Sequence, residues 1–127
     1  MYDVAYDLWF SKGSAKGDAN AVEILIMLNH RDLNHATVHI VKIDGVNWNT
    51  YSYTQHAGTK SWKFIVYRKV SLSNSVSNLA LSPFFKNAEG VSGGLKSNYY
   101  WSAIDGGFEI WRGGLGLDME SFSASGL

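Results

Sequence analysis

The sequence predicts an all-β protein, a β-jelly-roll sandwich of two antiparallel sheets with one short helix. The 127 residues include five Trp, seven Tyr, six Phe and 13 Gly but only one Pro. This composition is typical of short strands joined by tight turns. Apolar residues gather in strand-sized segments separated by turn clusters. A mass of 14.1 kDa fits one domain, so residues 1–127 are expected to form a single domain.

The expected elements follow from these segments in order. Strands are predicted at residues 2–10, 21–29, 36–43, 46–54, 62–71, 99–105, 108–111 and 117–125. The second of these is apolar on both faces, so it should be a central strand. Asp44-Gly45 is a hairpin signal, and loops are expected at residues 11–20, 31–34, 56–59 and 91–97. One helix is predicted at residues 79–88, with Pro83 in its first turn.

Charge and composition argue against several classes of protein. Eleven Lys and Arg balance eleven Asp and Glu, which argues against nucleic-acid binding and against a polybasic membrane-surface protein. No apolar run approaches the roughly 18 residues of a membrane span, and no signal peptide is expected. The sequence has no Cys, which excludes disulfides, thiolate metal sites and Cys nucleophiles.

Three carboxylates stand inside predicted strands. Glu23 lies in a very apolar segment, where a carboxylate is costly unless it is paired or functional. Glu109 follows two glycines and shares a strand face with Trp111, which gives a proton donor beside a platform for stacking sugars. Asp7 stands where Asp is rare and should need a partner. Each carboxylate also has a purely structural interpretation. In it, Glu23 lies at a strand edge or is paired, Glu109 is exposed, and Asp7 is hydrogen-bonded to the backbone.

Other chemistries have weaker signals. His35 and His39 are four residues apart, but no acidic third ligand stands at a metal spacing, so no metal site and no cofactor is expected. No nucleophile-elbow motif indicates Ser-His-Asp catalysis. The Gly-rich segments at 106–107 and 113–116 lack the following helix and the Lys-Ser/Thr of a phosphate loop.

Several segments, taken together, resemble glycoside hydrolase family 12, the small jelly-roll endoglucanases and xyloglucanases. Residues 4–10 (VAYDLWF) are similar to the family's AYDLWF strand, and residues 23–30 (EILIMLNH) to its ELMIWLNH strand. Residues 107–117 (GFEIWRGGLGL) resemble its GFEIWQGGxGL segment, and residues 121–123 (SFS) its closing strand. Because the similarity runs through nearly the whole chain in the right order, it is more specific than any single motif.

The resemblance implies a role for each carboxylate. Glu23 would be the nucleophile, Glu109 the general acid/base, and Asp7 would hydrogen-bond to Glu23 and orient it. Glu109 must begin the cycle protonated and Glu23 ionised. Since the family retains anomeric configuration, the carboxyl groups of the two glutamates are expected about 5–5.5 Å apart. Trp111 would line the cleft near the leaving group.

The chain also departs from the family's pattern. Met27 and Leu25 stand where the family has Trp and Met. Both share the face of Glu23 and should form the floor of the cleft, where they contact substrate together with Asn29 and Trp9. The chain is shorter than the family's catalytic domain and lacks its N-terminal strands, so an N-terminally shortened catalytic domain is expected.

The expected function is retaining hydrolysis of internal β-1,4-glucosidic bonds in cellulose-like glucans or xyloglucan. The expected partner is the polysaccharide alone, and the protein is expected to be an extracellular monomer. One alternative is a catalytically weak or inactive glycan-binding domain derived from the same fold. Another is a non-functional fragment, which should lack a cooperative melting transition. The presence of Asp7, Glu23 and Glu109 favours the enzyme, because a binding module needs none of them.

Overall fold

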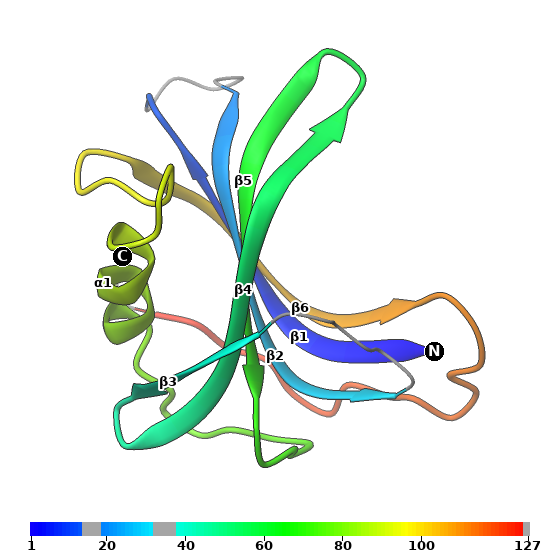
Figure 1. The fold of residues 1–127 in the computed structure, drawn as a ribbon. Helices are drawn as coiled ribbons and strands as arrows, with labels where there is room; N and C mark the ends of the chain where they lie inside the picture. The colour runs from blue at the N-terminus through cyan, green and yellow to red at the C-terminus, as the bar shows by residue number, and fades with distance from the viewer. Residues whose placement is uncertain (14–18, 32–37, 126–127) are drawn as a thin grey trace.

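The computed structural model describes residues 1–13, 19–31 and 38–125, which form one strongly twisted sheet with a helix against one of its faces (Figure 1). The all-β class with one short helix is therefore confirmed. The elements are β1 (Tyr2–Ser11), β2 (Asn20–Arg31), β3 (His39–Ile43), β4 (Val46–Ala57), β5 (Lys60–Lys69), α1 (Ser82–Glu89) and β6 (Tyr100–Ile110). Parts of the predicted loop at residues 11–20, of the turn at 31–34 and of the strand at 36–43 lie outside the described residues.

The strand order is β3-β4-β5-β2-β1-β6. The strand β2 lies inside the sheet between β5 and β1, as its apolar faces predict. The pairing of β2 with β5 is parallel and all other pairings are antiparallel. The described residues thus form one mixed sheet, where the sequence predicted two antiparallel sheets. The difference arises because the chain forms the β3–β4 hairpin after β2, so that β5 then runs beside β2 in the same direction. A hydrophobic pattern does not reveal this pairing.

Two tight turns fix the register of β3, β4 and β5. Asp44 and Gly45 have φ of 50° and 78°, and they connect β3 to β4 in a two-residue hairpin, as predicted. The β4–β5 ladder closes at Ala57 and Lys60 around Gly58, whose φ is 61°. The predicted loop at 56–59 is therefore shorter than expected, and β4 is longer. Because β4 and β5 are long, every second side chain along each of them lies on the same face of the sheet.

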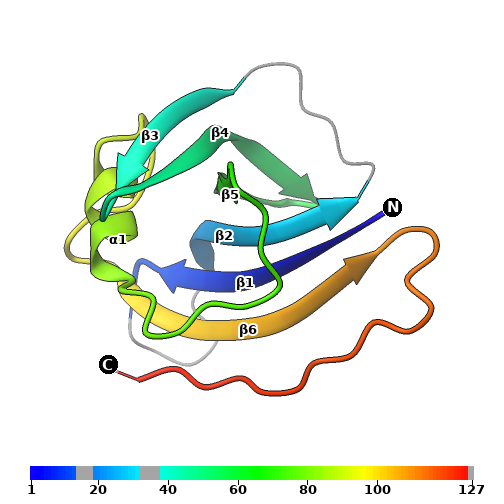
Figure 2. The same ribbon diagram turned by 90° about the horizontal axis from the view of Figure 1, so that it is seen from below.

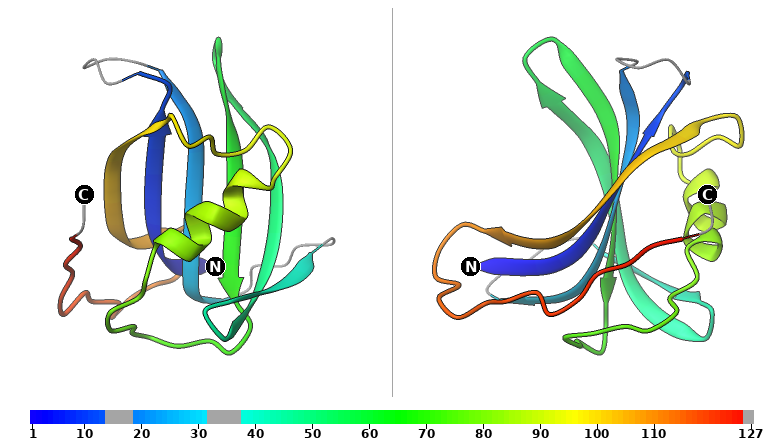
Figure 3. Two further views of the ribbon diagram at one scale, coloured as in Figure 1. Left: turned by 90° about the vertical axis from the view of Figure 1, so that its left-hand side faces the viewer. Right: turned by 180° about the vertical axis from the view of Figure 1, so that it is seen from behind.

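The last strand is β6, which runs unbroken through Gly106 and Gly107, where two strands were predicted. A Cβ on Gly106 would lie 2.7 Å from the ring of Phe122, so Gly is needed here for close approach of the C-terminal tail. The tail at residues 117–125 was predicted to be a strand, and this is wrong. It crosses the helix side of the sheet (Figures 2 and 3), packed through Phe122 on Tyr6, without a strand partner among the described residues.

The core lies between the sheet and α1. The helix begins at Ser82, later than predicted, and Pro83 occupies its first turn. Phe84 packs edge-to-face on Trp48 and Tyr67, with ring centroids 4.9 and 5.2 Å apart. The other buried residues of this core are Leu8, Phe10, Val22, Ile24, Ile26, Leu28, Ile43, Ile65, Ala88 and Leu95. This packing fixes the sheet and leaves its opposite face open for a site.

Candidate active site

The face of the sheet that points away from α1 carries a pocket of carboxylates and aromatic rings. Side chains alternate along β2, so Glu23, Leu25 and Met27 share this face while their neighbours enter the core. The pocket has a volume of about 330 Å³. It is lined by Asp3, Glu23, Leu25, Met27, Tyr51, Tyr53, Gln55, Phe64, Arg68, Glu109 and Trp111. Residues from five strands thus meet at one place.

Glu23 is the buried carboxylate of this pocket, with 8% of its surface exposed. Its Oε2 accepts a hydrogen bond of 2.6 Å from the indole N–H of Trp62. Burial raises the pKa of Glu23, hydrogen bonds from Trp62 and Asp7 oppose that rise, and the charge of Glu109 adds to it. The two neighbouring donors therefore counteract part of the effect of burial on the pKa of Glu23.

Asp7 lies beside Glu23 and interacts with it electrostatically. The pKa of Asp7 is raised to about 7, chiefly by burial and then by the charge of Glu23 and a hydrogen bond to Glu23, while the bond from Trp9 lowers it. Its Oδ2 accepts a 3.1 Å hydrogen bond from the indole N–H of Trp9, whereas its Oδ1 is buried and has no donor. Two ionised carboxylates cannot hydrogen-bond to each other, so the contact forms when Asp7 carries a proton and donates it toward Glu23.

Glu109 reaches the same pocket from β6 and is exposed. Its register partner on β1 is Asp3, whose Oδ1 accepts the backbone N–H of Glu109 at 3.2 Å. Trp111 follows the end of β6, and its backbone N–H is bonded to the carbonyl of Met1. Trp111 is 54% exposed and lines the pocket, so its ring is free to contact a ligand. The structure thus brings Glu23, Glu109 and Trp111 together, as the sequence predicted.

Asp3 is a pocket residue that the sequence analysis missed. It is only 1% exposed, and its Oδ2 has no hydrogen-bond partner. The pKa of Asp3 is raised to about 6, chiefly by burial. The hydrogen bond from the Glu109 backbone opposes this rise, and the charges of Glu109 and Asp7 contribute to it. The reasoning that singled out Asp7 would also have found Asp3, because Asp is rare inside strands.

Met27 and Leu25 form the floor of the pocket, as predicted from their alternation with Glu23. They are 3% and 4% exposed and pack in a small apolar cluster with Ala5 and Val66. This cluster is separate from the core beneath α1. The floor is therefore closed by aliphatic side chains.

Asn29 and Trp9 were predicted as substrate contacts on this face. Asn29 pairs with Val4 beyond a register shift in the β1–β2 ladder, and its side chain donates to Asn74 at 2.6 Å. It therefore lies in a different pocket, on the helix side, and the prediction that it shares the face of Glu23 is wrong. Trp9 is the register partner of Glu23 but lies beside the pocket, with its N–H engaged by Asp7.

The sequence analysis also missed the aromatic wall of the pocket. Tyr51, Tyr53 and Phe64 lie on β4 and β5, where Tyr53 packs edge-to-face on Phe64 at 5.2 Å. Trp62 precedes Phe64 by two residues and so shares its face. The alternation of aromatic residues along two neighbouring strands was the available signal for this wall.

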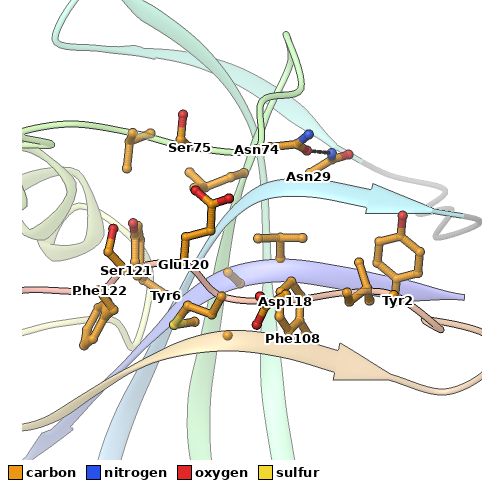
Figure 4. Close-up of a pocket in the computed structure, with 18 residues that line it drawn as sticks. Tyr2, Tyr6, Asn29, Asn74, Ser75, Phe108, Asp118, Glu120, Ser121 and Phe122 are labelled. Atoms are coloured by element: carbon orange, nitrogen blue, oxygen red, sulfur yellow. Dashed lines mark hydrogen bonds between the residues drawn. The ribbon is translucent and has the colours of Figure 1, made fainter.

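Two larger pockets, of about 610 and 700 Å³, lie on the helix side of the sheet along the C-terminal tail. Figure 4 shows the first, which Tyr2, Tyr6 and Phe108 of the sheet line together with the tail residues Glu120 and Phe122. None of the three predicted catalytic carboxylates lines either pocket. The smaller pocket around Glu23 is therefore the candidate active site.

The described residues show neither a metal-binding cluster nor a membrane-spanning helix. No group of three or more His, Cys, Asp and Glu residues there could hold a metal ion. His35 lies outside those ranges. Across the same residues, no helix is long and apolar enough to span a membrane.

The arrangement suits acid–base and nucleophilic chemistry at a single bond. Glu23 is buried and held by two donors, which favour its ionised form, whereas Glu109 approaches from the exposed side. Trp111 and the wall of β4 and β5 supply flat apolar surfaces, on which sugar rings commonly stack.

The chain is similar to known proteins in sequence and in fold. The family model for Glycosyl hydrolase family 12 matches residues 1–126. A family 12 xyloglucanase from Bacillus licheniformis is 25% identical, with a TM-score of 0.76 over 87% of this chain and 49% of that one. An endoglucanase from Rhodothermus marinus is 30% identical, with a TM-score of 0.71 over 89% of this chain and 50% of that one.

A family 11 xylanase from Neocallimastix patriciarum, at 18% identity and a TM-score of 0.62, shows likeness of fold alone over 84% of this chain and 49% of that one. These likenesses confirm the jelly-roll class. The chain spans about half the length of the solved structures that it matches. It matches no curated protein.

Proposed function

The chain belongs to glycosyl hydrolase family 12, and from this premise we propose that it is a retaining glycosidase that cleaves internal β-1,4-glucosidic bonds. Glu23 is the nucleophile, Glu109 the general acid/base and Asp7 the residue that orients Glu23. The observation that carries the proposal is the meeting of Glu23 and Glu109 in one pocket, with Asp7 beside Glu23.

The first step forms a covalent glycosyl-enzyme. The carboxylate of Glu23 attacks the anomeric carbon while the carboxylic acid of Glu109 protonates the leaving glycosidic oxygen. The hydrogen bonds from Trp62 and Asp7 hold the Glu23 oxygens in place and favour the charged nucleophile. Because these donors are already placed before substrate arrives, little reorganisation is needed in the transition state.

The second step hydrolyses the intermediate. Glu109, now a carboxylate, takes a proton from water, and the water oxygen attacks the anomeric carbon and releases Glu23. The exposed position of Glu109 gives water access to it. Two displacements restore the starting configuration, and neither step needs a cofactor.

We propose a polymeric β-glucan as the substrate. The pocket is an open face lined by Trp111, Tyr53 and Phe64, which suits a chain that runs past the catalytic residues. Similar chains are described as a xyloglucanase and an endoglucanase, so carboxymethylcellulose and xyloglucan are the substrates to test first. A polysaccharide is too large to enter a cell, so we propose that the protein acts outside the cell. We also propose that it is a monomer.

The test is release of reducing sugar from carboxymethylcellulose and xyloglucan. Glu23→Gln should lower the rate by about 10⁴-fold or more, because it removes the attacking oxygen anion. Glu89→Gln, the same change at the exposed end of α1, is the matched control and should leave the rate unaltered. A wild-type chain that melts cooperatively and binds xyloglucan without hydrolysing it would contradict the proposal in favour of a glycan-binding domain.

A further inference from the structure

Two tryptophans donate hydrogen bonds to the two neighbouring carboxyl groups of the active site. The indole N–H of Trp62 lies 2.6 Å from Oε2 of Glu23, and that of Trp9 lies 3.1 Å from Oδ2 of Asp7. Each carboxyl group thus has its own indole donor. Trp9 lies within the family motif at residues 4–10, but Trp62 does not follow from the motifs, because it lies 39 residues from Glu23.

The two indoles also pack against each other. Their ring centroids are 5.5 Å apart with an interplanar angle of 58°. Trp9 on β1 is the register partner of Glu23, and Trp62 on β5 shares the face of Phe64, which pairs with Glu23 from the other side. The rings therefore meet across β2 beside the carboxylate, and each limits the rotation of the other.

The two hydrogen bonds are unequal. A short bond from a neutral donor stabilises an ionised acceptor more than a long bond does, so the 2.6 Å bond favours negative charge on Glu23 over Asp7. Asp7 has a second oxygen, Oδ1, that is buried without a donor, which makes charge on Asp7 still less favourable. A proton on Asp7 gives that carboxyl group a donor toward Glu23.

We propose that Trp62, supported by Trp9, is a positioning residue that holds the negative charge of this carboxyl pair on Glu23 and the proton on Asp7. The inference rests on the proposed function only in naming Glu23 as the nucleophile. The arrangement readies Glu23 for attack before substrate binds. Other ionisable groups on the same face are Asp3, Tyr51, Tyr53, Arg68, Asp105 and Glu109.

The test follows the two carboxyl groups directly by carbon-13 NMR of side-chain-labelled Asp and Glu during a pH titration. Trp62→Phe should move the ionisation of Glu23 to higher pH by about one unit, because a hydrogen bond to a charged acceptor is lost. Trp9→Phe removes only the donor to Asp7. It should therefore move the ionisation of Asp7 to higher pH, and Glu23 should still ionise at a lower pH than Asp7. Identical titrations of Glu23 in the wild type and Trp62→Phe would overturn the inference.

Two further variants separate positioning from general loss of structure. Trp101→Phe is the matched control, since the Trp101 indole N–H bonds to the carbonyl of Ala103 and its ring packs at 5.6 Å on Phe85. It should leave both titrations unchanged. Replacing Trp62 with 3-benzothienylalanine keeps the ring and removes the N–H, so it should reproduce the Trp62→Phe shift in a chain with wild-type melting behaviour.

The titration needs no turnover, so the two proposals can fail separately. A chain without hydrolytic activity whose Glu23 titration shifts in Trp62→Phe would sustain the inference and sink the proposed function. An active enzyme should show the acidic limb of its rate profile moving to higher pH in the same variant. If the enzyme is active and Trp62→Phe changes neither the acidic limb of the rate profile nor the titration of Glu23, the proposed function stands and the role of Trp62 is rejected.

Discussion

The two faces of one strand, β2, have opposite surroundings. On the helix side, Val22, Ile24 and Ile26 are at most 1% exposed and pack beneath α1. On the other side, Glu23 lies among carboxyl groups and aromatic rings in an open pocket. A spacing of one residue therefore separates the core of the protein from its candidate catalytic centre.

The difference teaches how this fold combines stability with reactivity. On the helix side, apolar burial stabilises the fold, and the contacts are close and non-directional. On the pocket side, three buried or half-buried carboxyl groups have raised pKa values, and two of their oxygens lack donors. Such groups destabilise the fold at neutral pH, and the packed side offsets that cost. Changes on the two faces should therefore affect different measurements.

After Glu23→Gln, the largest effect expected in a rate is at Glu109. Glu109→Gln should slow hydrolysis of unactivated glucans by about 10²–10⁴-fold, because the leaving oxygen loses its proton donor. The loss should be much smaller in the first step with aryl glycosides whose leaving groups need no proton. The comparison requires initial rates on both substrate types. Equal losses on both would count against the acid assignment.

The largest effect expected on stability is at Phe84, on the helix side of the sheet. Phe84→Ala should lower the free energy of unfolding by about 3–5 kcal/mol, because a buried ring with two aromatic neighbours is replaced by a cavity. Urea unfolding followed by Trp fluorescence measures the change. Phe122→Ala, at a ring that is 39% exposed, should cost much less. A similar cost for the two would mean that the core beneath α1 is not the main source of stability.

A smaller and pH-dependent effect is expected at Asp3. Its pKa of about 6 lies above the ordinary value of 3.8, so the folded chain binds this proton more tightly than the unfolded chain. The resulting stabilisation is complete below about pH 4 and is lost as the pH rises through about 6. Asp3→Asn removes this dependence, and the difference in unfolding free energy between pH 4 and pH 7 should shrink by up to about 3 kcal/mol.

Urea unfolding at the two pH values tests this expectation at Asp3. The control is Asp118→Asn, because Asp118 lies exposed on the C-terminal tail. A variant with Asn at position 3 and the wild-type dependence on pH would show that Asp3 is not the titrating group. Asn keeps an oxygen that can accept the backbone N–H of Glu109, so the strand pairing should persist.

The smallest effect is expected at Trp111. Trp111→Ala should raise KM for xyloglucan by about 2- to 10-fold with little change in melting temperature, since a half-exposed ring adds roughly 0.5–1.5 kcal/mol of stacking. Trp111→Phe should recover most of the affinity because it keeps a flat ring. A large loss of stability with unchanged KM would instead assign Trp111 to the fold.

Much of the fold and of the site was predictable because it depends on short-range patterns. Alternation along β2 placed Glu23, Leu25 and Met27 on one face, and the Asp44-Gly45 signal gave the β3–β4 hairpin. The family motifs then indicated which carboxylates would meet. These features depend on residues that are close in sequence or on a recognisable local motif.

The missed features depend on pairing between distant segments. Trp62 reaches Glu23 only because β5 returns parallel to β2, and Asp3 meets Glu109 only because β6 pairs with β1. Asn29 changes face because of a register shift that no local pattern signals. Residues 117–125 have the alternation of a strand but no strand partner among the described residues, and propensity alone does not supply one.

The central claim is that Glu23 forms a covalent bond to the sugar, and trapping that bond tests it most directly. The folded chain would be incubated with an activated 2-deoxy-2-fluoro cellobioside, whose glycosyl-enzyme hydrolyses slowly, and then digested for peptide mass spectrometry. The account predicts one added glycosyl group, located on Glu23 in the β2 peptide and absent from Glu23→Gln. A chain that hydrolyses glucan but carries no adduct, or carries it on another residue, would contradict the account.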